Sequence, residues 1–285
     1  MTKPELPPIR NIVEKYGLKA SKKFGQHFLF DLNLTEKIVR LSDVKAGDLV
    51  FEIGPGPGGL TRPLLAAKTN VHVIETDQRF LPALAELGEF YDDKLSIHLG
   101  DALEFDLNEL ANSQKFKVVS NLPYNVGTAL LIKWLTSDIL LWQSLTLMFQ
   151  LEVAQRITAK VGSKNYGRLS ILCAAIAKTE LVMQVPASVF TPPPKVESAI
   201  VHLTPLPENQ RFGDLQTLAK ITAMAFGQKR KMLRASLKPL SVEIKQDIST
   251  WLQAIEIDPT TRPETLTPTQ FMNICTTYTS SAQVA

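Results

Sequence analysis

The chain has 285 residues, 45% of them hydrophobic and 21% charged, with a formal net charge of +3. This length suffices for two domains with a buried core, and the composition is ordinary for a globular protein. No apolar run has membrane-spanning length and no secretory signal pattern occurs, so a membrane-spanning or secreted protein is not expected. Two distant cysteines, Cys173 and Cys275, agree with a reducing compartment, and we expect a soluble cytoplasmic protein.

Strand and helix patterns alternate through the first half of the chain. Apolar, β-branched runs predict strands at 49–53, 71–75, 95–99, 116–120 and 144–151. Helical patterns lie between them. This alternation predicts an α/β fold with a parallel, doubly wound, Rossmann-like sheet.

The pattern changes beyond the last of these strands. A helix at 167–177 is followed by strands at 180–185 and 196–203, and two strands in succession indicate an antiparallel hairpin that closes the sheet. A proline-rich linker at 205–213 precedes helical patterns only, at 215–226, 229–237, 242–255 and 268–278. We predict a catalytic domain over 1–206, with an N-terminal arm, and a small all-α domain over 207–285.

The first strand runs into a glycine-rich turn in the stretch FEIGPGPGGLT, residues 51–61. Gly54, Gly56 and Gly59 have the G-x-G-x-x-G spacing of dinucleotide-binding turns. The two prolines between these glycines have no N–H to donate, however. The turn is therefore a poor cradle for a pyrophosphate and a rigid wall for some other ligand.

Acidic residues follow the next two strands. Glu75 ends the second strand, where a carboxylate commonly binds both ribose hydroxyls and would repel a ribose phosphate. Asp101 follows the third strand, where it could accept a hydrogen bond from an adenine amine. Each acid alone could be a solvated loop residue or a helix cap, but together they indicate an adenosine without a pyrophosphate. S-adenosylmethionine is such a ligand.

The segment SNLPYN, residues 120–125, follows the fourth strand and resembles the signature of methyltransferases that modify exocyclic amines of bases. The Asn121 side-chain oxygen and the Leu122 carbonyl can accept hydrogen bonds from the two N–H groups of such an amine. These bonds favour a pyramidal nitrogen whose lone pair is no longer delocalised into the ring. Pro123 stiffens the turn, and Tyr124 offers a face on which an extruded base can stack. We predict methyl transfer by direct displacement, helped by proximity and orientation.

Several segments together resemble the ribosomal RNA adenine dimethyltransferase family over nearly the whole chain, most closely its bacterial small-subunit members. They are KKFGQHFLFD (22–31), EIGPGPGGLT, VIETD, GDAL, NLPYN, VFTPPPKVESAIV and FGQKRKMLRASL. The resemblance implies S-adenosylmethionine as the cofactor and two methyl transfers to each of two adjacent adenosines near the 3′ end of small-subunit ribosomal RNA. It also implies a role in small-subunit biogenesis without a metal or a membrane partner, and we expect a monomer.

The resemblance assigns roles to matching positions. Cofactor contacts are implied for His27, Leu29, Gly54, Glu75, Asp101 and Asn121. Phe190 resembles a position whose ring, with that of Tyr124, helps to sandwich the target base, although a core aromatic is nearly as good an interpretation. Contacts to RNA phosphates are implied for the basic residues Lys22, Lys23, Lys229, Arg230, Lys231 and Arg234.

Three other functions are compatible with parts of this pattern. The chain could methylate a large-subunit adenosine, as the antibiotic-resistance relatives do, although PKV-x-S and the basic helical segment favour the small-subunit type. It could be a non-catalytic assembly factor, against which an intact NLPY segment argues. An NAD-linked oxidoreductase is disfavoured by the prolines of the glycine turn.

Overall fold

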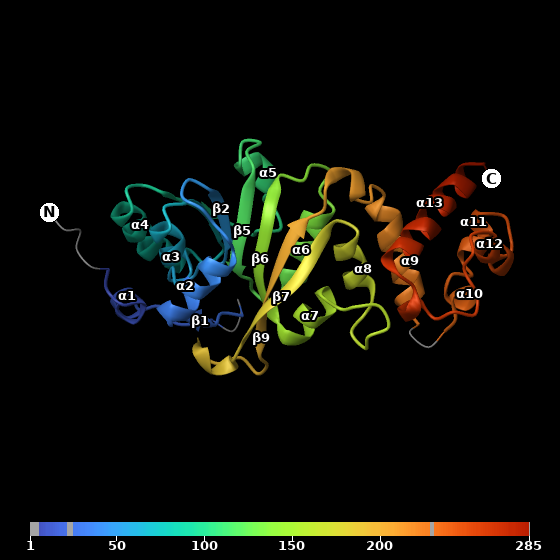
Figure 1. Cartoon of the computed structure of the whole chain (residues 1–285). Helices are drawn as coiled ribbons and strands as arrows, with labels where there is room; N and C mark the ends of the chain where they lie inside the picture. The colour runs from blue at the N-terminus through green and yellow to red at the C-terminus, as the bar shows by residue number, and fades with distance from the viewer. Residues whose placement is uncertain (1–5, 22–24, 229–230, 285) are drawn as a thin grey trace. The chain divides into compact units, whose positions relative to one another are not determined.

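The computed structural model describes residues 6–21, 25–228 and 231–284 (Figure 1). By contacts, the chain divides into two compact units. The first comprises Met1–Ala154 and Glu180–Thr204, and the second comprises Gln155–Thr179 and Pro205–Ala285. Residues 155–179 thus group with the C-terminal helices, which differs from the predicted division at residue 206. The reason is that a helix of this segment packs on two of the C-terminal helices.

A seven-stranded sheet with the order β4-β3-β2-β5-β6-β9-β7 forms the centre of the first unit. The strands are β2 (Leu49–Ile53), β3 (Asn70–Glu75), β4 (Leu95–Leu99), β5 (Phe116–Asn121), β6 (Trp142–Gln150), β7 (Ala177–Val185) and β9 (Ser198–Pro205). The strands from β2 to β6 pair in parallel, and β9 pairs antiparallel with β6. The predicted parallel α/β sheet is therefore confirmed.

Helices alternate with these strands along the chain. They are α1 (Ile9–Lys15), α2 (Leu32–Leu41), α3 (Thr61–Ala66), α4 (Leu81–Phe90), α5 (Leu107–Leu110), α6 (Gly127–Leu135) and α7 (Leu151–Ile157). Asp31 starts α2 by accepting a hydrogen bond from the Leu34 N–H with its side chain, as an N-cap residue does. The central strand β2 is so apolar because it is covered on both faces: Val50 and Phe51 are fully buried.

The order of the strands reverses at β2, which has β3 on one side and β5 on the other. In open α/β sheets, ligands bind beside the carboxyl ends of the strands at such a switch point. The segments that follow β2, β3 and β5 carry the glycine turn, Glu75 and the NLPY segment. The topology therefore brings the predicted ligand-binding residues to one edge of the sheet.

Two very short strands form a separate pair that the sequence did not indicate. β1 (Phe28–Leu29) runs antiparallel to β8 (Phe190–Thr191), with Leu29 opposite Phe190. This pair fastens the N-terminal arm to the segment that precedes β9.

The second unit is helical. It contains α8 (Arg168–Ala174), α9 (Leu215–Phe226), α10 (Leu233–Ser236), α11 (Leu240–Glu243), α12 (Ile248–Ala254) and α13 (Pro268–Val284). Asp214 caps α9 through the Thr217 N–H, and α9 packs against α8 and α13. The Tyr166 hydroxyl donates to the Leu266 carbonyl and ties the loop before α8 to the C-terminal segment.

Two predicted helices of this unit are wrong in extent. Of the helix expected over 229–237, residues 229 and 230 lie outside the described part, and within 231–237 the structure shows Leu233–Ser236, because Met232 has an extended backbone with φ −68° and ψ 158°. The helix expected over 242–255 is two helices, α11 and α12. Lys245 has a left-handed φ of 51°, and Asp247 starts the second helix by accepting from two backbone N–H groups.

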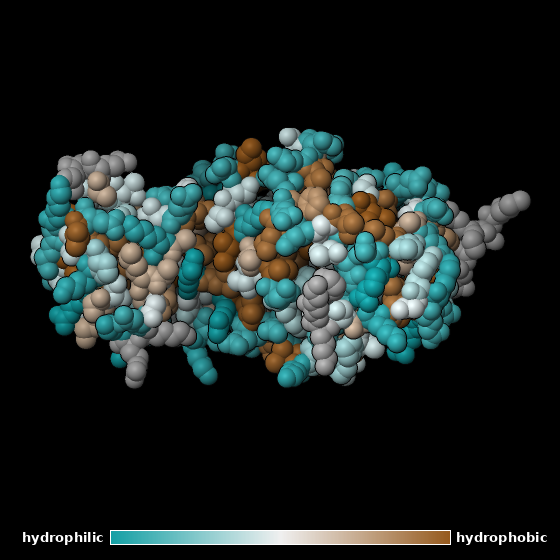
Figure 2. All heavy atoms as spheres, turned by 180° about the vertical axis from the view of Figure 1, so that it is seen from behind, coloured by the Kyte–Doolittle hydropathy of each residue, from teal (hydrophilic) through white to brown (hydrophobic). Residues whose placement is uncertain are grey.

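Figure 2 shows one face of the molecule, on which hydrophobic side chains lie in several separate groups among hydrophilic ones. Within 6–21, 25–228 and 231–284, no helix combines the length and the apolar composition needed to cross a membrane.

Candidate active site

A cavity of about 270 Å³ lies at the carboxyl ends of the central strands. Its walls come from the N-terminal arm, the glycine turn, the ends of β3 and β5, and the loop after β4. The predicted cofactor and catalytic residues all line it: His27, Leu29, Gly54, Glu75, Asp101, Asn121, Leu122, Pro123 and Tyr124. Five separate segments of the sequence thus meet in one place, although the role of each residue stays a prediction.

The glycine turn uses its backbone N–H groups within the protein. The Gly54 N–H donates to the Ile74 carbonyl, that of Gly56 to Glu75, and that of Gly58 to the Pro55 carbonyl. The prolines at 55 and 57 have none. Over residues 54–58, which are all described, every N–H therefore has an acceptor already, and this turn is not built to bind a pyrophosphate.

The first glycine allows the turn to lie against the NLPY segment. Gly54 has a φ of 66°, and a Cβ atom there would lie 3.3 Å from the Pro123 ring. Gly56, with a φ of 55°, points its N–H at the Glu75 carboxylate. Both positions need a left-handed backbone that glycine adopts without strain.

Glu75 is fixed in place by two backbone groups. One carboxylate oxygen accepts from the Gly56 N–H at 3.0 Å and the other from the Asp77 N–H at 2.8 Å. Burial raises the pKa of this carboxyl, against the effect of these two hydrogen bonds, and the side chain is about 5% exposed. Each carboxylate oxygen can accept more than one hydrogen bond, so the fixed group can still receive two hydroxyls of a ribose.

Asp101 is exposed, in the loop after β4. Its Oδ1 accepts from the Leu103 N–H at 2.9 Å within a turn, so it does not cap a helix: the next helix, α5, is capped by Asp106. A carboxylate has a second oxygen and further acceptor capacity, so this bond is compatible with a contact to an adenine amine.

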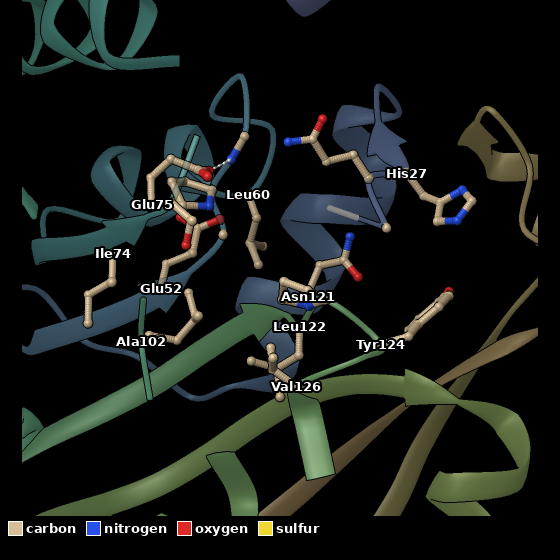
Figure 3. A pocket seen from close by; sticks show the side chains of 18 of the residues that line it. His27, Glu52, Leu60, Ile74, Glu75, Ala102, Asn121, Leu122, Tyr124 and Val126 are labelled. Atoms are coloured by element: carbon tan, nitrogen blue, oxygen red, sulfur yellow. Dashed lines mark hydrogen bonds between the residues drawn. The ribbon is translucent and has the colours of Figure 1, made fainter. Parts of the chain in front are cut away.

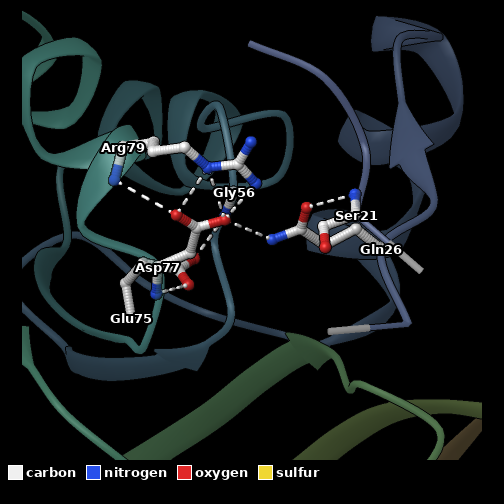
Figure 4. A network of polar contacts seen from close by, with 6 residues as sticks. All are labelled: Ser21, Gln26, Gly56, Glu75, Asp77 and Arg79. Carbon is white, nitrogen blue, oxygen red and sulfur yellow. Dashed lines mark hydrogen bonds and ion pairs between the residues drawn. The ribbon is translucent and has the colours of Figure 1, made fainter. Parts of the chain in front are cut away.

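A polar network that the sequence analysis missed joins the N-terminal arm to the end of β3 (Figure 4). Gln26 donates to the Asp77 carboxylate at 3.0 Å, and its side-chain oxygen accepts from the Ser21 N–H. Arg79 also binds Asp77, and together these contacts lower the pKa of the Asp77 carboxyl to about 2. Asp77 is therefore an ionised anchor that holds the arm beside the cavity.

A second carboxylate in the cavity was also missed. Glu52 lies one residue before the end of β2, is about 2% exposed, and accepts from the Thr61 hydroxyl at 2.7 Å. Burial raises the pKa of Glu52 to about 8. In the sequence this residue reads as one polar position inside an apolar strand, and only the cavity shows that it lies beside Glu75.

The end of β5 is tied to the end of β2. The Ser120 hydroxyl donates to the Ile53 carbonyl at 2.8 Å, and Asn121 follows it directly. The Pro123 carbonyl accepts from the N–H groups of Val126 and Gly127, which closes the turn before α6. In Figure 3, Asn121 lies between an acidic side of the cavity, with Glu52 and Glu75, and an aromatic side, with Tyr124 and His27.

Three rings gather on the aromatic side. The His27 ring centroid is 5.9 Å from that of Tyr124 and 6.5 Å from that of Phe190. The His27 Nδ1 lies 2.7 Å from the Pro192 carbonyl oxygen. Phe190 itself is about 2% exposed and packs in the hydrophobic core, so its role beside a target base stays a prediction.

Of the six basic residues predicted to contact RNA phosphates, the structure describes two. Lys22, Lys23, Lys229 and Arg230 lie outside the described residues. Lys231 and Arg234 are exposed in the second unit. Across the described parts of the chain, no cluster of three or more His, Cys, Asp or Glu side chains could hold a metal ion.

The cavity fits S-adenosylmethionine better than a dinucleotide. Glu75 can receive a ribose, the Asp101 loop lies at the adjacent strand end, and the glycine turn offers close approach without an anion site. The aromatic side beyond Asn121 is lined by Tyr124 and His27. Asn121 therefore lies between a side suited to an adenosine cofactor and a side lined by aromatic rings (Figure 3).

Comparisons with known proteins also indicate a methyltransferase. A family model described as "Ribosomal RNA adenine dimethylase" matches residues 17–280. "Ribosomal RNA small subunit methyltransferase A" of Roseobacter denitrificans is 53% identical over 267 residues, which cover 91% of this chain and 92% of that protein.

Two solved structures are also similar. A dimethyladenosine transferase from Plasmodium falciparum has a TM-score of 0.76 and 27% identity, covering 90% of this chain and 98% of its own. The 23S rRNA methyltransferase ErmE has a TM-score of 0.66 at 24% identity, covering 87% and 98%, and this likeness shows the fold alone.

Proposed function

The chain belongs to the ribosomal RNA adenine dimethylase family, and we propose that it dimethylates two adjacent adenosines in a hairpin near the 3′ end of small-subunit ribosomal RNA. Membership makes it an S-adenosylmethionine-dependent methyltransferase that acts on adenines of ribosomal RNA. The observation that carries the substrate proposal is the 53% identity to a small-subunit enzyme over nearly the full length of both chains. We further propose that the protein acts as a monomer in the cytoplasm during small-subunit biogenesis.

In this proposal some residues of the cavity bind the cofactor and others orient the target amine. Glu75 and Asp101 hold the adenosine part of the cofactor, with His27, Leu29 and Gly54 enclosing the rest. The bound cofactor supplies an electrophilic methyl group on a sulfonium. Glu75 is suited to its task because two backbone N–H groups fix its oxygens before any ligand arrives.

Asn121 and Leu122 act on the acceptor. An aromatic amine is a weak nucleophile because its lone pair is delocalised into the ring. The Asn121 side-chain oxygen and the Leu122 carbonyl accept hydrogen bonds from its two N–H groups. This favours a pyramidal nitrogen with its lone pair toward the methyl group. Tyr124 stacks on the extruded base and fixes its plane. Orientation supplies much of the rate, and the resulting ammonium is acidic enough to lose its proton without a strong base.

The test is methyl transfer from labelled S-adenosylmethionine to small ribosomal subunits that lack these modifications, followed by mapping of the labelled adenosines. Two adjacent dimethyladenosines near the 3′ end of the RNA are the expected result. Label on a large-subunit adenosine would place the protein with the resistance enzymes instead. Binding of S-adenosylhomocysteine without any transfer would favour a non-catalytic assembly factor, and binding of NADH would contradict the whole assignment.

A further inference from the structure

The PKV-x-S segment, residues 194–198, favours the small-subunit type of enzyme over the large-subunit type. The proposed reaction nevertheless uses none of its residues. Its serine, Ser198, is the first residue of β9 and is fully buried. The Ser198 hydroxyl lies 2.6 Å from the Tyr124 hydroxyl, so one of the two donates a hydrogen bond to the other. This contact joins two parts of the chain that are 74 residues apart.

The phenol group of Tyr124 is placed for anchoring rather than for chemistry. In Figure 3 its hydroxyl points away from Asn121, on the far side of the ring from the transfer position. Burial raises the pKa of the Tyr124 phenol, which keeps it neutral and able to hydrogen-bond at physiological pH. The face of the ring is what a base would contact, and rotation of the ring would change the plane of that base.

The sheet fixes the distance between the two groups that act on the base. Asn121 on β5 is paired with Met148 of β6, and Ser198 on β9 is paired with Gln150 of β6. Both residues are thus held by the same strand, two positions apart. A ring anchored to Ser198 is therefore held in register with the Asn121 side chain.

We propose that Ser198 is a positioning residue, which fixes the Tyr124 ring through the hydroxyl pair so that the target base lies in plane with Asn121. The proposal rests on the proposed role of Tyr124 as the stacking face. It gives the serine of PKV-x-S a function in base orientation and predicts a defect in transfer rather than in cofactor binding.

A double-mutant cycle tests the pair. Ser198→Ala should lower the kcat of methyl transfer roughly fivefold to tenfold, with the Kd of S-adenosylhomocysteine unchanged within twofold. Tyr124→Phe, which removes the other hydroxyl and keeps the ring, should give a similar fall, and the double variant should fall no further. Ser144→Ala is the matched control, since its buried hydroxyl on β6 has no hydrogen-bond partner among the described residues, and its kcat should not change.

Independent effects, in which the losses of the two single variants multiply, would overturn the proposal, as would an unchanged kcat in Ser198→Ala. If Ser198→Ala does not fold, Tyr124→Phe still decides, because an unchanged kcat in this variant contradicts an anchored ring. The cycle is measured on whichever ribosomal subunit accepts the label. A wrong substrate assignment therefore leads to a different labelled RNA, whereas a wrong role for Ser198 leads to independent effects on the same RNA.

Discussion

The carbonyl oxygen of Leu29 lies directly over Gly59, so closely that a Cβ atom at position 59 would be 2.5 Å from it. Leu29 belongs to the N-terminal arm and Gly59 to the glycine turn. The third glycine of the G-x-G-x-x-G spacing is therefore needed for packing of the arm, and the arm in turn encloses the cavity.

Gly59→Ala should displace the arm, because the contact is to a backbone atom that cannot rotate away. Overpacking of this kind costs roughly 1–3 kcal/mol, and we expect Tm to fall by several degrees. The Kd of S-adenosylhomocysteine should rise at least tenfold, measured by calorimetry. Gly213→Ala is the control, since a Cβ there meets nothing within 4 Å, and both quantities should stay unchanged. Normal cofactor affinity in Gly59→Ala would show that the arm is not needed to hold the cofactor.

Glu75→Gln should weaken cofactor binding while leaving the fold intact. The amide keeps one oxygen, but its NH₂ group would face a backbone N–H of Gly56 or Asp77 that now has no acceptor. With the proposed charge-assisted bonds to the ribose also lost, we expect the Kd of S-adenosylhomocysteine to rise about 10- to 100-fold. Glu104→Gln, at an exposed acid of the loop after β4, should bind normally.

The stability of the free protein should depend on pH through Glu52. Its pKa in the folded state is about 8, against 4.5 for an ordinary glutamate, so between these values the folded state holds one proton that the unfolded state has lost. The free energy of unfolding should therefore fall as pH rises through this window, by at most about 1.4 kcal/mol per pH unit, and level off above pH 8.

Glu52→Gln tests this dependence. The glutamine oxygen can still accept from the Thr61 hydroxyl, but the side chain cannot ionise. The variant should have a flatter profile and be more stable than the parent at pH 8.5, on the order of 3 kcal/mol, in urea unfolding without ligand. Parallel profiles for the two proteins would mean that Glu52 is ionised in the folded state at neutral pH.

The sequence predicted those features that depend on local pattern. The strands at 49–53 and 95–99 are found with the expected bounds: the first is a short apolar run that is buried, and the second is a half-exposed strand that ends at the Gly100–Asp101 turn. The fold class, the family and the cofactor are confirmed for the same reason: they depend on short segments placed in order along an alternating chain.

The rest depends on contacts between distant residues, which no local pattern encodes. The pairing of β1 with β8 involves two residues on each side, and the bond from Gln26 to Asp77 spans 51 positions. The Tyr124–Ser198 pair is a further example, because both residues belong to recognised segments but nothing in either segment indicates the other. In the second unit, a helical pattern over 242–255 concealed the break that Lys245 and Asp247 introduce.

Asn121→Ala separates the chemistry from cofactor binding. The side-chain oxygen is one of two acceptors proposed for the target amine, and removal of one preorganised group of this kind typically costs about 100- to 1,000-fold in rate. We expect a loss of that size in single-turnover methyl transfer to unmodified small subunits. The Kd of S-adenosylhomocysteine should change less, because the groups proposed to hold the adenosine part, Glu75 and Asp101, are unaltered in this variant.

Gln143→Ala is the control for Asn121→Ala, because it removes an exposed amide near the start of β6, and its activity should be normal. A second comparison, Asn121→Asp, keeps an oxygen acceptor but adds a negative charge near Glu52 and Glu75. If the acceptor role is correct, Asn121→Asp should retain more transfer activity than Asn121→Ala. Full activity in Asn121→Ala would mean that the Leu122 carbonyl and the stacked base suffice for orientation, and Asn121 would then have no part in activating the amine.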